Sequence, residues 1–319
     1  RLSYHDKPRY HGGLASLTLK LASVAFFVSM QAMIKAVSDH IPPGEAVFFR
    51  SFFALPIIFT WLMWQGRLTV ALKTDHLRGN LMRGIFGVCG MGLSFAAVGY
   101  LPLPEVTAIF FASPILTTIF AAMFLGERVR MIRIAAVGLG LFGVLIILWP
   151  RLTGFGHIAG TEANFMAFGA MLAFVAACFV SVAKILVRRL VGKDHPSTVV
   201  LYAGLCATGA GLLTAPFGWV WPTSSEWALL LAAGLVGGIG QALLTTAYKF
   251  ADASTIAPFD YSSMLFAIAF GYFIFADLPT LQTLIGAAIV ISAGGIILWR
   301  EGRLRLERAA ARQITPSGG

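Results

Sequence analysis

The chain has 319 residues, of which 58% are hydrophobic and only 12% are charged, with 24 Lys and Arg against 14 Asp and Glu. Soluble domains carry about 25% charged residues, so the composition excludes an ordinary water-soluble protein and predicts a lipid surround. The net charge is +10, but most Lys and Arg residues lie in the tails and in the connections between apolar segments. This distribution indicates a role in orienting the chain in a membrane rather than in binding nucleic acid. The three cysteines lie within apolar runs, as packing residues do, without a disulfide or metal-binding pattern.

Ten apolar segments are each long enough to cross a bilayer as a helix, which takes about 20 residues. Their runs are continuous rather than alternating, which excludes a β-barrel. In chain order the predicted spans are residues 15–36, 45–64, 79–98, 104–125, 132–149, 164–187, 197–217, 226–247, 253–275 and 279–299. We therefore predict an all-α polytopic membrane protein, followed by a basic cytoplasmic tail at residues 300–319.

Basic residues are divided unequally between the two sides of these spans. The two tails and alternate connections hold 18 Lys and Arg, whereas the other five connections together hold only Arg151. By the positive-inside rule, both termini are predicted to be cytoplasmic.

An internal duplication joins the two halves of the chain. At an offset of 150 positions, residues 84–149 and 234–299 share eleven identities without a gap, including Gly84, Gly87 and Gly90 with Gly234, Gly237 and Gly240. The predicted repeats, 15–149 and 164–299, have five helices each, and an odd number inverts the second copy in the membrane. Inverted repeats place a substrate site near the midplane between the copies and permit alternating access, so this architecture indicates a transporter.

Particular residues of the first repeat also resemble a known family. They are Arg50 within 45–50, the segment 96–102, and a set of turn and packing residues: Pro114, Glu127, Gly138, Gly140 and Gly143. They resemble the drug/metabolite transporter superfamily, specifically its EamA-type ten-helix exporters. The second repeat is more divergent: Asp277 occupies the position of Glu127, and Met264 replaces the proline.

In size, helix number and aromatic content, the chain is most similar to the YddG-type amino-acid exporters of bacterial inner membranes. That resemblance implies a central cavity formed by predicted helices 1–4 and 6–9, with helices 5 and 10 bracing it from outside. It also implies export of aromatic or other neutral amino acids.

Several polar residues of the first two helices are candidates for this cavity. Gln31 and Lys35 lie on one stripe of helix 1 together with Lys20, and Gln31 is interpreted either as a hydrogen-bond partner of another helix or as cavity lining. Lys35 and Arg50 lie towards the outer membrane face, where they either pair with Glu45 or Glu105 or bind a substrate carboxylate. Lys20, Arg83 and Lys184 lie near cytoplasmic ends, from which we expect them to snorkel towards water.

The third, eighth and ninth helices supply the remaining candidates. The spacing of Gly84, Gly87, Gly90, Gly234, Gly237 and Gly240 predicts close helix packing rather than a nucleotide loop. Tyr100, Gln241, Tyr248 and Tyr261 are candidates for an aromatic cavity, although aromatic residues also face lipid and protein cores. Asp260 follows Pro258, which can break the helix, and either pairs with a cation of helix 3 or 6, binds a substrate amine, or carries a proton.

These features predict a secondary transporter that exports small metabolites, with aromatic or other neutral amino acids favoured. A drug or nucleotide-sugar carrier is the alternative, but nucleotide sugars need several converging cations and those here are dispersed. An intramembrane enzyme is disfavoured because the chain lacks HExxH, GxSxG and paired facing aspartates. We expect no cofactor, metal or nucleic acid; the expected partners are a small-molecule substrate and the bilayer, for which a monomer suffices.

Overall fold

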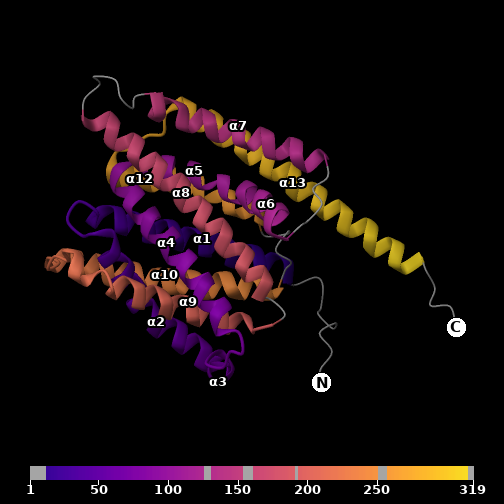
Figure 1. The fold of residues 1–319 in the computed structure, drawn as a ribbon, viewed down its shortest axis with the longest axis horizontal. Helices are drawn as coiled ribbons and strands as arrows, with labels where there is room; N and C mark the ends of the chain where they lie inside the picture. The colour runs from indigo at the N-terminus through magenta and orange to yellow at the C-terminus, as the bar shows by residue number, and fades with distance from the viewer. Residues whose placement is uncertain (1–11, 126–130, 154–160, 191–192, 251–256, 315–319) are drawn as a thin grey trace.

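The computed structural model describes residues 12–125, 131–153, 161–190, 193–250 and 257–314, and within these ranges every regular element is a helix (Figure 1). Among the described residues, six helical segments are long and apolar enough to cross a membrane, one of them composed of α5 and α6 together, and four shorter apolar helices accompany them. The first half comprises α1 (Gly12–Val37), α2 (Pro43–Trp64), the short α3 (Leu68–Ala71), α4 (Leu77–Tyr100), α5 (Leu103–Phe110), α6 (Ala112–Leu125) and α7 (Met131–Thr153). The second half comprises α8 (Thr161–Leu190), α9 (Pro196–Leu212), η1 (Ala215–Phe217), α10 (Ser224–Phe250), η2 (Ala257–Ser262), α12 (Ser263–Phe275) and α13 (Leu281–Ile314).

The predicted spans coincide with these helices, and the helical class of the protein is confirmed, whereas the count of ten membrane crossings stays a prediction. Two spans are interrupted. The span 104–125 is divided into α5 and α6, because Pro114 has no N–H to donate to the carbonyl of Phe110. The span 253–275 starts with the 3₁₀ helix η2 before α12, and its residues 253–256, like Glu127, lie outside the described residues.

The last helix is longer than its predicted span. α13 continues without a break to Ile314, into the predicted basic tail of residues 300–319, and protrudes beyond the other helices (Figure 1). Its apolar part covers Leu281–Ile296. Beyond it Arg303 stacks on the ring of Trp299 at 5.4 Å, one helical turn away.

Helices pack mainly across the two halves of the chain. α1 packs against α10 and α4 against α8, while α2 packs against α9 and α7 against α13. In the expected duplication α1 corresponds to α8 and α4 to α10, so the first two contacts are the same contact made twice. α7 and α13 lie side by side along one edge of the bundle, the bracing position that the resemblance implies (Figure 1). The inverted orientation of the two halves in a membrane stays a prediction.

Glycines allow these helices to approach closely. A Cβ atom added to Gly84 would lie 2.6 Å from the side chain of Cys206, and one added to Gly90 would lie 2.7 Å from Val180. In the second half Gly234 lies against Phe53, and Gly240 against Phe26. The expected packing role therefore fits these four positions. Gly87 is different, because a Cβ there would meet nothing within 4 Å; the prediction that it packs against another helix is wrong.

Candidate functional site

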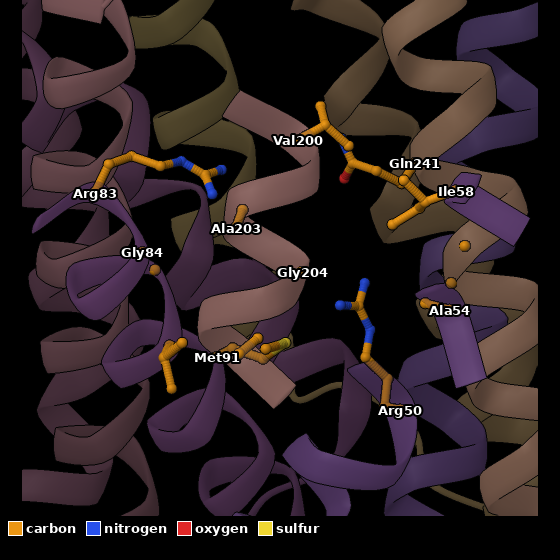
Figure 2. Close-up of a pocket in the computed structure, with 15 residues that line it drawn as sticks. Arg50, Ala54, Ile58, Arg83, Gly84, Met91, Val200, Ala203, Gly204 and Gln241 are labelled. Atoms are coloured by element: carbon orange, nitrogen blue, oxygen red, sulfur yellow. The ribbon is translucent and has the colours of Figure 1, made fainter. Parts of the chain in front are cut away.

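A cavity of about 140 Å³ lies between α2, α4, α9 and α10, two helices from each half of the chain (Figure 2). Fewer helices line it than the resemblance implies, since α1, α5, α6, α8 and α12 contribute no lining residue. The lining residues are Arg50, Ala54, Ile58, Arg83, Gly84, Gly87, Val88, Met91, Val200, Ala203, Gly204, Ala207, Gly237, Gly238 and Gln241.

Small residues at helical spacing create the hollow. On α2 the lining residues Arg50, Ala54 and Ile58 recur every four positions, which places them on one face of the helix. On α9 the run from Ala203 to Ala207 presents Ala and Gly to the cavity. Gly87 opens the α4 wall in the same way. Where other glycines bring helices together, these small residues leave space between them.

Arg50 points into this cavity from α2 (Figure 2). Its Nε donates to the thioether sulfur of Met30 at 3.2 Å, and a thioether is a weak acceptor. Gly237 makes room for the side chain: a Cβ at this position would lie 2.7 Å from the Met30 sulfur and 3.1 Å from Arg50 Nε. Within the described residues, no carboxylate lies within 4.0 Å of the Arg50 guanidinium.

Arg83 lines the cavity from α4, which the sequence analysis did not predict (Figure 2). Instead of snorkelling to water, the side chain turns inward, and its buried Nε has no hydrogen-bond partner in the described structure. A helical wheel of α4 contains the missing signal, because Arg83 lies four residues before Gly87 and therefore on the same face. The interpretation from depth alone was wrong.

The cavity wall carries cations without acids. Among its lining residues are two arginines and Gln241, and none is an aspartate or glutamate. A guanidinium stays protonated in proteins, so both charges persist whether or not a ligand is present. An anionic group entering the cavity would therefore meet two donors with unsatisfied capacity.

Of the eight predicted cavity residues, Arg50 and Gln241 line this cavity and the other six lie elsewhere. Lys35 lies in the last turn of α1, and its Nζ is 3.3 Å from Asp277 Oδ2. The same Nζ donates a hydrogen bond to the carbonyl of Leu101 at 2.9 Å. Its ion-pair partner is thus Asp277 rather than Glu45 or Glu105. Gln31 is half-buried on α1, outside the lining set.

The predicted tyrosines also lie outside the cavity wall. Tyr100 packs against Phe165 and Phe168 at centroid distances of 6.0 and 5.4 Å. Tyr261 contacts the ring of Phe111 edge-on at 5.2 Å. These contacts support packing for both side chains, one of the alternatives that the sequence left open.

Asp260 forms an ion pair with a cation that the sequence analysis did not select as its partner. Its carboxylate lies 2.6 Å from Lys20 Nζ, which belongs to α1 rather than to predicted helix 3 or 6. The Lys20 side chain is only 3% exposed, whereas that of Asp260 is 56% exposed. Lys20 also lies over the ring of Tyr248, 5.8 Å from its centroid. Lys20 therefore binds Asp260 instead of snorkelling, and with Lys35 and Asp277 it ties both ends of α1 to the η2–α12 region.

Lys184, the third residue expected to snorkel, contacts a helix break. Its Nζ donates to Ser113 Oγ at 3.0 Å, next to the junction of α5 and α6. Ser181 Oγ donates to the carbonyl of Ser113 at 3.0 Å, so α8 supplies hydrogen bonds where the α5–α6 helix is interrupted.

A second polar cluster joins Asp194, which precedes α9, to the segment before α4 and to the first turn of α4. Asp194 accepts hydrogen bonds from Thr74 at 2.7 Å and from the buried Asn80 at 2.5 Å, and its other oxygen lies 3.4 Å from His76 Nδ1. Burial by itself would raise the pKa of Asp194, but these hydrogen bonds outweigh it and hold the pKa below its usual value. The cluster fixes the start of α4, on which Arg83 depends for its position.

Comparison with known proteins places this architecture among transporters. The model of the EamA-like transporter family matches residues 14–149 and 167–299. The chain is 29% identical to a pseudopaline exporter of Pseudomonas aeruginosa, over 86% of this chain and 92% of that protein. It is 29% identical to a riboflavin transporter of Vibrio cholerae, over 95% and 99% of the two chains. It is 28% identical to an S-adenosylmethionine uptake transporter of Rickettsia bellii, over 92% and 95%.

A solved crystal structure shares the fold. It is 20% identical in sequence, with a TM-score of 0.62 over 91% of this chain and 99% of the solved chain. Thus the family match and the relatives cover both halves of the chain, and the solved structure shares its fold.

Proposed function

Because the chain belongs to the EamA-like transporter family, we propose that it is a secondary transporter that carries a small carboxylate-bearing metabolite through the cavity between α2, α4, α9 and α10. One observation carries the proposal: an otherwise apolar bundle holds a cavity with two guanidinium groups and no acidic wall residue. Charges within membrane helices are costly and mark substrate pathways. The family and its relatives are transporters and not enzymes.

Amino acids, including the aromatic and other neutral ones expected from the sequence, are the first substrates to test. Their carboxylate suits a guanidinium, which binds it through two parallel hydrogen bonds. The cavity volume of about 140 Å³ is similar to that of an apolar protein cavity that holds benzene, about 150 Å³. Such a volume favours a substrate of amino-acid size in this conformation over the ligands named for the riboflavin and S-adenosylmethionine relatives.

An aromatic layer supports alternating access. At the end of the bundle where α2 begins, the ring centroid of Phe49 lies 4.8 Å from that of Trp227 and 5.8 Å from that of Trp219. Glu45 accepts a hydrogen bond there from the backbone N–H of Val220 at 3.0 Å. Arg50 follows Pro43 by seven residues, so the cavity starts about 10 Å beyond that end of α2. We propose that this layer closes the outer side, and that the cavity communicates with the cytoplasmic side in this conformation.

Direction and location complete the proposal. We propose export across a bacterial inner membrane, with both termini cytoplasmic, because basic residues are concentrated on one side of the predicted spans. The relatives include an exporter and uptake transporters, so uptake is the competing direction.

The experiment is substrate counterflow in liposomes that contain the purified protein. Liposomes preloaded with each of the twenty amino acids are diluted into a trace of labelled phenylalanine or glutamate, and protein-free liposomes are the control. Saturable accumulation that one or more amino acids compete for is expected. If no amino acid supports exchange while riboflavin or S-adenosylmethionine does, the substrate assignment is wrong. Export is tested separately by comparing labelled amino-acid retention in cells with and without the protein.

A further inference from the structure

The charges of the cavity are unbalanced by two, and this imbalance defines the chemistry of its ligand. Arg50 and Arg83 both point into the cavity, from different walls (Figure 2). Arg83 Nε is buried without a hydrogen-bond partner, and the one hydrogen bond from Arg50 that the described structure contains goes to the sulfur of Met30. Neither cation has a carboxylate within 4.0 Å among the described residues.

Two lysines of α1, unlike the cavity arginines, have acidic partners. Lys20 has Asp260 at 2.6 Å, and Lys35 has Asp277 at 3.3 Å. These two lysines of α1 are thus paired with acids and Lys184 donates to a serine hydroxyl, whereas the two cavity arginines have no acid within 4.0 Å among the described residues. An uncompensated charge in an apolar site is costly, and arginine does not relieve the cost by losing its proton. The missing counter-charges therefore have to come from a molecule that enters the cavity.

The two arginines also lie at different depths. α2 and α4 are joined by the α3 turn, and Arg50 lies 14 residues before the end of α2, whereas Arg83 lies six residues after the start of α4. At 1.5 Å per residue these Cα positions differ by about 12 Å along the bundle if the two helices are straight and antiparallel. Two anionic groups separated by a short spacer suit this arrangement better than a single carboxylate does.

We propose, on the basis of the transport function above, that the substrate presents two anionic groups, one bound by Arg50 and one by Arg83. An amino acid with a carboxylate side chain and a small dicarboxylate both satisfy this chemistry. Gln241, on the α10 wall, adds an amide that can accept a hydrogen bond from an ammonium group or donate one to a carboxylate. The arginine pair thereby selects by charge among metabolites of similar size.

The test compares compounds that differ in one charge and hardly in shape. In the liposome counterflow assay, glutamate is compared with glutamine and succinate with its monoamide succinamate, each as a competitor, with phenylalanine as the neutral aromatic reference. The dianionic or acidic member of each pair is expected to compete about 10- to 100-fold more strongly, the range that one lost hydrogen-bonded charge contact predicts.

Variants then assign the preference to the two side chains. Arg50→Gln and Arg83→Gln are each expected to lower the preference for glutamate over glutamine about 10-fold or more. Arg50→Lys and Arg83→Lys keep the charge but not the two-pronged geometry, and should retain part of the preference. Arg78→Gln is the matched control, because it removes an exposed arginine of the same helix, five residues before Arg83 and outside the cavity.

Folding is checked by size-exclusion elution and by the thermal unfolding midpoint of each variant in detergent. If glutamine or phenylalanine is exchanged as well as glutamate, and Arg83→Gln changes no preference, the two-anion inference is overturned while the transport function stands. If none of these compounds is exchanged, the proposed amino-acid function fails and the inference fails with it. If a glutamine variant does not fold, the corresponding lysine variant decides: a partial or full loss of the preference for glutamate supports a contact with the arginine guanidinium, and an unchanged preference overturns it.

Discussion

Filling the cavity from Gly87 should stop transport without disturbing the fold. Gly87 lines the cavity, and a Cβ atom added to it meets nothing within 4 Å. Gly87→Leu therefore directs a large side chain into the space that the substrate is proposed to occupy. Most other glycines of α4 do not offer this test, because a side chain at Gly84 or Gly90 would collide with Cys206 or Val180.

The expected magnitude follows from volume. Leucine adds four carbon atoms, and an apolar cavity of about 150 Å³ holds the six carbons of one benzene molecule, so the side chain fills roughly two thirds of such a space. The cavity holds about 140 Å³, so little room remains for a substrate. Helix propensity changes in the favourable direction, by about 0.5–1 kcal/mol, because glycine is among the poorest helix formers. We expect the initial rate of exchange to fall at least about 10-fold, without loss of thermal stability.

The assay is counterflow at equal protein density for wild type, Gly87→Leu and a matched variant, Gly138→Leu. Gly138 lies on the exposed face of α7, also has no atom within 4 Å of an added Cβ, and is absent from the cavity wall. Gly138→Leu should therefore transport at the wild-type rate. A folded Gly87→Leu protein that transports as fast as wild type would refute the assignment of this cavity as the substrate path.

Three further predictions concern polar contacts outside the cavity. Asp260→Asn leaves the buried Lys20 without its ion-pair partner and should lower stability by about 1–2 kcal/mol, a value reduced from that of a fully buried pair because Asp260 is exposed. Lys20→Met combined with Asp260→Asn should recover part of this loss in thermal melting. Proton-driven transport by Asp260→Asn would show that this carboxylate is not the coupling group. Lys35→Met should lower the melting midpoint by removing the ion pair to Asp277, yet leave competition by glutamate unchanged; a selective loss of competition would place Lys35 in the substrate path. Asp194→Asn should destabilise the protein by about 1 kcal/mol at pH 7. Because the folded-state pKa of Asp194 is lowered, the stabilisation is complete above the unfolded pKa of about 4 and disappears as pH falls through the folded pKa. The difference between the variant and wild-type melting midpoints should therefore be smaller at pH 3 than at pH 7.

Helix positions could be predicted from the sequence because a run of about 20 apolar residues has few alternatives in a membrane. The break between α5 and α6 was signalled by Pro114, but the sequence did not indicate that Ser181 and Lys184 of another helix would contact this junction. Such contacts depend on which helices become neighbours. That choice is made by tertiary packing rather than by hydropathy.

The candidate site was likewise predictable only in part. The wheel of helix 1 placed Lys20 and Lys35 on one stripe with Gln31, but it did not indicate that both lysines face acids of the second half. Arg83 was assigned by its depth, which hydropathy gives, whereas its role depends on rotation about the helix axis. Substrate class was beyond the motifs of the sequence, because it depends on which charges lack partners after folding.

The pairing of helices across the two halves has a consequence for how the chain is made. α1, α2 and α4 find their main neighbours in α10, α9 and α8, so synthesis of the first half exposes glycine-lined faces before any partner helix exists. Contacts this distant in sequence form late and slowly. The newly made first half therefore lacks these partners in the bilayer, and assembly is completed only after α13, the partner of α7, has been inserted. A ribosome pausing between the halves would lengthen this interval, whereas a pause after α13 would not.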